Sequence, residues 1–562
     1  MVASMNLHGY TNELIQWEYQ SNISYNDPFN DIELDVTIVT PKQKQFTVPT
    51  FWTGKQTWAI RFIPEEVGEY SINTNCSDSN NLSLHKHKST LNIHQGEEPL
   101  QKPLSLSQNK RYLIQNNKPF FWLSDTWWMA LSSRLTYPKK FEELTAYRKA
   151  QGFNIIMLVA GLFPDMGSFD ERSTNEAGFA WEKNYAQINP HYFNEADKRI
   201  THLIDAGLTP CILGAWGYYL QELGIKKMKQ HWRYIIARWG IYPVVWGVAG
   251  EATMPYYLST HRQKDAKYLK KGWTEIAHYI KELDPFHRLL TIHPTEVGKE
   301  QLMDNNILDI NLLQASHHGY GSISNSTKLL NQEKDKKPIM PMIMSELNYE
   351  GILRDTHDAV QRLGFWSAIL SGSKGYGYGA NGIWQINTED NPFGATPHGG
   401  TWGNTPWEEA LKLNGAKHIC ASHKILETYE WWLLEPMQDY IIPVQDVQNP
   451  KSVYLAGIKS YLRIAYFYNP VYPWEKPHFQ LTHLNPDTSY TGFFIDPKNG
   501  QKHTITNIKI SSDGCWEIPS FPSYEDWVVV LRFNANSRYL LKNKKKSFSL
   551  ISLIIKKLWK KL

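Results

Sequence analysis

The sequence predicts a multidomain protein of mixed α/β and all-β structure, with a central (β/α)8 TIM barrel between two β-sandwich domains. Three observations lead to this fold class. The chain has 562 residues, which is too long for one ordinary domain. Short strand patterns bounded by turns occupy both ends of the chain. Between them, apolar runs alternate with helical segments, which is typical of parallel β/α units.

Residues 1–98 are predicted to form the first β-sandwich. Five short segments there alternate apolar and polar residues between turns: IELDVTIVT, KQFTVPTFW, WAIRFIP, EYSINTNC and HKSTLNIH. The stretch GEEPLQKPLS that follows has the composition of a linker.

Residues 106–435 are predicted to form the barrel, because about eight apolar runs alternate with helical segments. FNIIMLVA, for example, precedes the helical FNEADKRITHLIDAG, and LTPCILGAW comes next. Eight such units close most naturally into a TIM barrel, whose active site lies at the carboxyl ends of the strands. The alternative is a doubly wound open sheet, which favours a glycine-rich phosphate loop after the first strand. SDTWWMA stands there instead.

The strand pattern returns over residues 436–534, with segments such as SVYLAGIK, YLRIAYFYN and DWVVVLRF, and predicts a second β-sandwich. Residues 535–562 form a basic tail. Residues 538–562 hold one arginine, eight lysines and no acid, a charge of +9. Subtracting +9 from the net +4 leaves −5 for the remainder, so we expect no nucleic-acid partner.

Cysteine usage and the N-terminus bear on location. The four cysteines lie far apart without a CxxC pair, which fits a reducing compartment better than a disulfide framework or a zinc site. The N-terminus lacks a basic segment followed by an apolar one, and no run of eighteen apolar residues occurs. We therefore expect a cytoplasmic protein.

Several polar and aromatic residues follow the predicted barrel strands directly. They are Asp125 after the first strand, Trp216 after the third, Glu251 after the fourth, His317 and His318 after the sixth, and Glu346 after the seventh. Glycoside hydrolysis needs two carboxylates, one to protonate the leaving oxygen and one to attack the anomeric carbon or activate water. Burial and mutual repulsion keep one of them protonated near neutral pH. Aromatic residues make up 13% of the chain, and their flat faces can pack on sugar rings or simply fill cores.

Four segments in this order resemble the apiosidase-like glycoside hydrolases over about residues 106–435: RYLIQNNKPFFWLSDTWW, YRKAQGFNIIMLV, WGVAGEATMPY and SELNYEG. The flanking regions look like the family's usual companions, an N-terminal β-sandwich and a C-terminal one of the kind labelled collagen-binding. TGFFIDPKNG resembles the W-x-DPR-x-G hairpin of the latter.

The resemblance implies a retaining hydrolase of the large barrel clan, with its acid/base after the fourth strand and its nucleophile after the seventh. Glu251 then takes the acid/base position and Glu346 the nucleophile position. The wider clan often has Asn before the acid/base, where this chain has Gly250, and some apiosidase-like members carry Asp at the acid/base position itself. The structural alternatives are a helix cap or salt bridge for Glu251 and an arginine-paired strand end for Glu346.

Further residues are candidates for substrate binding. Tyr349 can steer the nucleophile through a hydrogen bond, and Glu350 can support it. The complete set is Asp125, Trp127, Trp128, Trp216, His317, Tyr349, Glu350 and Trp384, with Trp402 as a further possible sugar platform. Each tryptophan has a place in a core as its alternative. His317 and His318 have no Cys or His partner at metal-ligand spacing, so no metal and no organic cofactor is expected.

The expected function is cleavage of O-glycosidic bonds in a poly- or oligosaccharide by a retaining two-carboxylate mechanism. Two alternatives remain at this point. One is a non-catalytic carbohydrate-binding or scaffold protein, and the other is a transglycosylase or lyase that uses the same cleft.

The tail suggests contact with a membrane. On a helix, residues 541–562 would place apolar residues 551, 554, 555, 558 and 562 along one stripe and four lysines beside it. This pattern is typical of a helix lying on an anionic surface, here the inner membrane face. The alternatives are a frayed tail and a helix that docks on the protein itself.

We expect deletion of residues 536–562 to release the protein from anionic liposomes, because both the apolar stripe and the lysines are lost. Co-sedimentation with vesicles measures binding, and activity on a soluble substrate is the control that should persist. Equal sedimentation of the truncated and complete proteins would contradict the membrane role.

Overall fold

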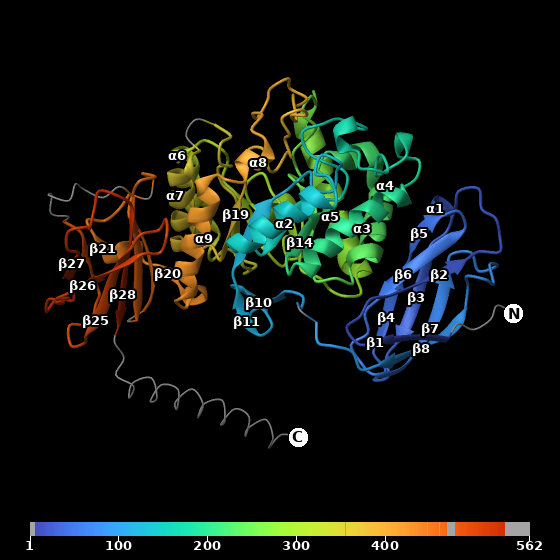
Figure 1. Ribbon diagram of the computed structural model, residues 1–562, viewed down its shortest axis with the longest axis horizontal. Coiled ribbons are helices and arrows are strands. Elements are labelled where there is room, and N and C mark those ends of the chain that lie inside the picture. Colours follow the sequence, from blue (N-terminus) through green and yellow to red (C-terminus); the bar gives the residue numbers. More distant parts are fainter. Residues whose placement is uncertain are drawn as a thin grey trace, which may run out of the picture. The chain divides into compact units, whose positions relative to one another are not determined.

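The computed structural model describes residues 6–99, 101–353, 356–446, 448–459, 461–468 and 478–533 (Figure 1). The chain divides into two compact units, Met1–His423 and Lys424–Leu562. The predicted tail, residues 535–562, lies outside the described residues. Within the described part, no helix is both long enough and apolar enough to cross a membrane.

Residues 6–98 form two sheets, which confirms a β-rich N-terminal flank (Figure 1). The larger sheet has the order β1-β8-β7-β3-β4 and the smaller one β2-β6-β5. The strands are β1 (Asn6–Tyr10), β2 (Ile15–Gln20), β3 (Leu34–Val39), β4 (Gln45–Pro49), β5 (Phe51–Gly54), β6 (Thr57–Phe62), β7 (Gly68–Cys76) and β8 (Lys88–His94), with a short helix α1 (Pro28–Asp31) after β2.

One predicted segment of this region, KQFTVPTFW, is divided between the two sheets. Its first part is β4 and its second part is β5. The chain changes sheets at Thr50, whose N–H and hydroxyl both donate to the carbonyl of Leu34, at 3.1 and 2.8 Å. An alternating pattern runs through both parts, so the sequence predicts a single strand where the structure has two.

The barrel prediction is confirmed. Eight parallel strands follow the order β16-β15-β14-β13-β12-β19-β18-β17, so the first strand, β12, pairs with the last, β19. Parallel strands are covered on both faces, which explains why all of Ile155–Val159 is buried. The strands are β12 (Trp122–Thr126), β13 (Ile155–Val159), β14 (Thr209–Leu213), β15 (Val245–Gly250), β16 (Leu290–His293), β17 (Asn311–Gln314), β18 (Met342–Glu346) and β19 (Gly375–Tyr378).

The barrel is nearly closed, with an irregular seam between β16 and β17. Asp309 N–H donates to the Leu290 carbonyl at 2.8 Å, and the Thr291 hydroxyl donates to the Ile310 carbonyl at 2.9 Å. The connection over residues 294–310, all of them described, holds only the 3-10 turn η3 (Gly298–Gln301) where other units have an α-helix. The fifth β/α unit therefore departs from the predicted pattern.

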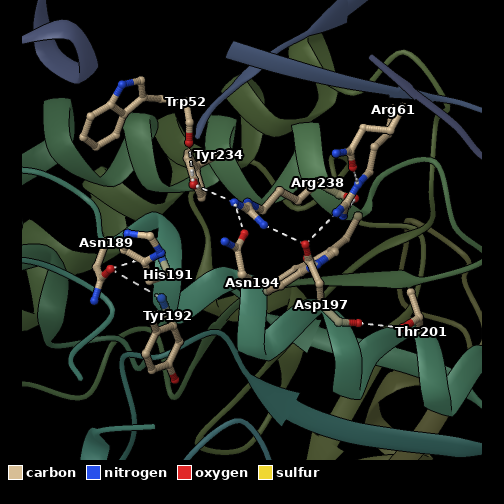
Figure 2. Close-up of polar contacts among 12 residues, drawn as sticks. Trp52, Arg61, Asn189, His191, Tyr192, Asn194, Asp197, Thr201, Tyr234 and Arg238 are labelled. Carbon is tan, nitrogen blue, oxygen red and sulfur yellow. Dashed lines mark hydrogen bonds and ion pairs between the residues drawn. The ribbon is translucent and has the colours of Figure 1, made fainter. Parts of the chain in front are cut away.

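Helices surround the strands where the sequence predicts them (Figure 1). Asn189 caps α3 by accepting hydrogen bonds from the N–H groups of His191 and Tyr192 (Figure 2). Gly152 ends α2 in a left-handed conformation, with φ of 117°. The helices are α2 (Lys139–Gln151), α3 (Pro190–Asp205), α4 (Tyr219–Trp239), α5 (Arg262–Leu283), α6 (Tyr320–Glu333), α7 (Asp358–Leu370), α8 (Trp407–Ala410) and α9 (Asn414–Glu427).

A buried ion cluster joins the N-terminal sheets to the barrel helices (Figure 2). Asp197 of α3 accepts from Arg61 of β6 and from Arg238 of α4, each at 2.6 Å. Its other oxygen accepts from the Trp239 indole at 2.7 Å. Burial opposes ionisation of Asp197, but the two guanidinium groups outweigh it and hold its pKa below the ordinary value.

The second unit is also rich in strands. A six-stranded sheet has the order β20-β22-β23-β28-β25-β26, and a three-stranded sheet has the order β21-β24-β27. Their facing sides share a core that includes Leu455, Phe494, Trp516 and Val529. The strands are β20 (Glu435–Pro436), β21 (Ile441–Ile442), β22 (Tyr454–Ile458), β23 (Leu462–Phe467), β24 (Gln480–Leu481), β25 (Tyr490–Ile495), β26 (Lys502–Ile505), β27 (Trp516–Glu517) and β28 (Trp527–Phe533).

We expect Asp197→Ala to destabilise the protein by about 3–5 kcal/mol, because it leaves two buried guanidinium groups without their carboxylate. Chemical denaturation measures this change. Glu195→Ala is a matched control on the same helix, since Glu195 pairs only with the half-exposed Lys198 and should cost at most about 1 kcal/mol. Equal losses in the two variants would contradict the role of the cluster.

Candidate active site

Four polar side chains meet at the carboxyl ends of neighbouring barrel strands. His293 ends β16, Gln314 ends β17, Glu346 ends β18, and Glu251 directly follows β15. Parallel strands finish on one face of a barrel, so residues distant in sequence converge there. The structure thus brings together the two carboxylates that the sequence predicts to be catalytic.

Glu346 is surrounded by hydrogen-bonding groups. The Tyr349 hydroxyl donates to its Oε2, and His317 Nε2 lies 2.9 Å from its Oε1. His293 Nε2 lies 3.2 Å from Oε2, and Gln314 Nε2 donates to Oε1 at 3.2 Å. Burial opposes ionisation, but the imidazoles of His293 and His317 outweigh it and lower the pKa of Glu346 well below its ordinary value. Glu346 is therefore an ionised carboxylate.

The protonation of His317 follows from its contacts. Its Nδ1 lies 3.2 Å from the backbone N–H of Tyr349, which can only donate. Nδ1 must therefore be the acceptor, and the proton lies on Nε2, which donates to Glu346. The structure places His317, which the sequence predicts to bind substrate, and Tyr349, which it predicts to steer the nucleophile, beside Glu346. The neighbouring His318 is exposed, and its N–H donates to Ser322 at 2.8 Å.

Glu251 is held in a distinct environment. Its backbone adopts φ of 46°, and its N–H donates to the carbonyl of His293 at 2.7 Å. Its Oε1 accepts from Gln314 Nε2 at 3.2 Å. Burial, and then the charge of Glu346, raise the pKa of Glu251 to about 7. The two carboxylates therefore have pKa values on opposite sides of the ordinary one.

Trp216 leaves no room for a side chain at Gly250. A Cβ at Gly250 would collide with the Trp216 indole, because the backbones of the two residues lie side by side in a parallel β-bridge. The Trp216 ring also lies 5.4 Å from the Trp128 ring and 5.8 Å from the His293 ring. An aromatic side chain thus occupies the space that a side chain at position 250 would need.

Several predicted binding residues lie in this group. Trp128 contacts His293 with 5.0 Å between ring centres, and Trp384 contacts Tyr349 at 6.2 Å. The Trp402 indole donates to Asp165 at 3.0 Å. Trp128, Trp216, Trp384 and Tyr349 are each at most 4% exposed, so the walls of the site are tightly packed.

The structure does not bring Asp125, Trp127 and Glu350 to the carboxylates. Asp125 accepts from Arg148 of α2 at 2.7 Å and from the Trp127 indole at 2.8 Å, and both ion-pair partners are fully buried. Glu350 accepts from the Tyr378 hydroxyl at 2.6 Å and from Gly415 N–H at 3.1 Å. These three residues support the contact between the barrel strands and the helices.

Four residues of the site were not predicted: His293, Gln314, Asp165 and Tyr257. His293 and Gln314 end predicted strands, and that position was the signal that could have identified them. Asp165 and Tyr257 lie in loops after β13 and β15, and the Tyr257 hydroxyl accepts from Asp165 N–H at 3.1 Å. Burial raises the pKa of Asp165, and the charge of Glu346 acts in the same direction. Asp165 is thus a third acid at the mouth.

Comparison with known proteins agrees with this geometry. Residues 107–433 match the family model described as apiosidase-like, catalytic domain, and residues 10–77 match a domain family of unknown function, DUF5060. By sequence, no curated protein shows a significant match.

Solved structures show the same fold. A glycoside hydrolase is 20% identical and has a TM-score of 0.61, covering 76% of this chain and 96% of its own. A glycoside hydrolase family 5 protein from Bacteroides vulgatus is 19% identical with a TM-score of 0.63, over 79% of this chain and 96% of its own. A second protein from that species aligns over 94% of this chain and 100% of its own, at 16% identity and a TM-score of 0.66. The chain belongs to the apiosidase-like family of glycoside hydrolases.

Proposed function

We propose that this protein hydrolyses O-glycosidic bonds of an oligo- or polysaccharide with net retention, with Glu346 as nucleophile and Glu251 as acid/base. The observation that carries the proposal is a pair of carboxylates, Glu346 buried and Glu251 partly buried, that are bridged by one amide and have pKa values shifted in opposite directions. Such a pair supplies a proton donor and an ionised nucleophile at the same pH.

In the first step, an oxygen of Glu346 forms a bond to the anomeric carbon while the glycosidic C–O bond breaks. The leaving oxygen takes the proton of Glu251, so Glu251 becomes a carboxylate as the charge of Glu346 is consumed. His317 and Tyr349 orient the nucleophile through their hydrogen bonds.

In the second step, Glu251 removes a proton from water, and the water oxygen attacks the same carbon. The bond to Glu346 breaks, which releases the sugar and restores both carboxyl groups. Two inversions at one carbon give net retention.

The shared amide keeps one oxygen of each carboxylate near the other, which is compatible with the spacing of a retaining enzyme. Both Oε1 atoms lie 3.2 Å from Gln314 Nε2, so they are at most twice that distance apart. Inverting enzymes need room for a water between the carboxyl groups, at about 6.5–9.5 Å, and retaining enzymes have about 5–5.5 Å.

The walls of the site fit a sugar. Tryptophan faces suit the C–H faces of pyranose rings. Trp216 Nε1, Trp384 Nε1, His293 Nδ1 and Gln314 Oε1 are buried and have no hydrogen-bond partner among the described residues. Sugar hydroxyls both donate and accept, so a bound carbohydrate can satisfy such groups.

We expect Glu346→Ala to abolish hydrolysis in a screen against plant and bacterial surface glycans, because no nucleophile remains. Glu251→Ala should lose about 10²–10⁴-fold in kcat on substrates with poor leaving groups. Glu282→Ala, an exposed acid on α5, is the control that should match the wild type. Full activity of Glu346→Ala would refute the assignment, and NMR of the first-formed anomer tests retention.

We expect kcat/KM to fall as the pH rises through about 7, since Glu251 must carry its proton and its pKa is raised to about 7. Glu346 must be ionised, and because its pKa is lowered, the acid limb should lie well below neutral pH. The measurement is a pH profile on an aryl glycoside found in the screen. An alkaline limb that persists in Glu251→Ala would show that another group titrates.

A further inference from the structure

We propose that Gln314 is a positioning residue that decides which oxygen of Glu251 carries the catalytic proton. The proposal rests on the proposed function, because it concerns the same acid. It goes further by assigning the proton to one atom, Oε2, and by naming the group that keeps it there.

Gln314 has an unusual set of contacts. Its Nε2 donates to Glu251 Oε1 and to Glu346 Oε1, each at 3.2 Å, and the residue is only 8% exposed. Both hydrogens of the amide nitrogen are therefore used, one for each catalytic carboxylate.

The orientation of the amide follows from the charge of Glu346. An ionised carboxylate can only accept, so the group that Gln314 turns toward Glu346 must be its NH2 and not its carbonyl oxygen. Because the same nitrogen also faces Glu251, the Glu251 oxygen at that contact must accept as well. Glu251 Oε1 therefore bears no proton.

These contacts determine where the proton lies in the neutral form of Glu251. A proton on Oε1 would point at the N–H of Gln314, and donor against donor is unfavourable. The proton of neutral Glu251 therefore lies on Oε2, the oxygen that is not occupied by Gln314. One hydrogen bond of ordinary strength is enough to favour this form about tenfold.

Gln314 is held in place by the barrel itself. It lies opposite Glu346 at the end of the β17–β18 ladder, after a register shift at Leu313. Its backbone N–H donates to the carbonyl of Glu296 at 2.9 Å. Such an irregularity re-aims the side chain that follows it, here toward the two acids.

A purely structural glutamine would satisfy both ends of its amide. Gln314 instead uses its nitrogen twice and leaves its buried Oε1 without a hydrogen-bond partner in the described residues. A buried carbonyl oxygen without a partner costs stability. We explain this cost by the two carboxylates, which determine the position of the amide in place of packing.

The test is Gln314→Leu, measured on aryl glycosides with poor and with activated leaving groups. Departure of a dinitrophenolate needs no proton, so a misplaced acid proton affects only the poor leaving groups. We expect kcat/KM to fall about tenfold for the poor leaving groups and less than about threefold for the activated ones. The alkaline limb should move to higher pH, since the hydrogen bond from Gln314 lowers the pKa of Glu251.

The matched control is Gln301→Leu. Gln301 is a buried amide at the same mouth that accepts from Thr253 N–H and its hydroxyl, at 3.2 and 2.8 Å, and contacts neither carboxylate. Gln301→Leu should not change the ratio of kcat/KM between the activated and the poor leaving groups. It should also leave the alkaline limb of the pH profile in place. The other titratable groups near Glu251, namely Glu346, His293, Asp165 and Tyr257, are the same in both variants.

Equal losses of Gln314→Leu on both substrate classes, or none on either, would overturn the proposal. If Gln314→Leu does not fold, Gln314→Met keeps the length of the side chain without adding a charge and removes both donors, and the same leaving-group dependence is expected. Failure of the proposed function would look different, because Glu346→Ala would then retain the wild-type rate on the activated substrate.

Discussion

Two neighbouring carboxylates that share one amide nitrogen cannot both be ionised at low cost, and the rest of the site depends on this constraint. The charge goes to Glu346, where the imidazoles of His293 and His317 and the hydroxyl of Tyr349 stabilise it. Glu251 has Gln314 but fewer donors, and the charge of Glu346 disfavours its own. The proposed roles of Glu346 as nucleophile and Glu251 as acid therefore follow from the distribution of donors.

The donors in turn depend on the barrel. His293, Gln314 and Glu346 are the last residues of three neighbouring strands, and the strand ladders set their spacing. The seam between β16 and β17 is irregular, and β17 and β18 shift register just before Gln314 and Glu346. Irregular pairing at this end of the barrel turns these side chains toward a common point. Regular strands would instead distribute the side chains evenly around the mouth.

The sequence predicted the barrel and both carboxylates, because a polar residue after an apolar strand marks the mouth. It could not separate Trp127 from Trp128. Both residues follow the end of β12 and both are buried, so the apolar pattern does not show which of them turns toward the barrel mouth. Asp125 and Trp127 turn toward α2, whereas Trp128 turns toward His293. The sequence also does not show that the loop after β18 turns Glu350 toward Tyr378.

The glycine at position 250, where the resemblance to the wider clan implies an asparagine, is explained by the neighbouring Trp216. The Trp216 indole fills the space beside the acid, so no side chain at position 250 could reach a sugar there. The ring itself is a flat surface, and its buried N–H has no hydrogen-bond partner in the described protein. Under the proposed function, contacts to a sugar beside Glu251 come from an aromatic face and an indole donor. This exchange favours substrates that present a C–H face and an acceptor at that position.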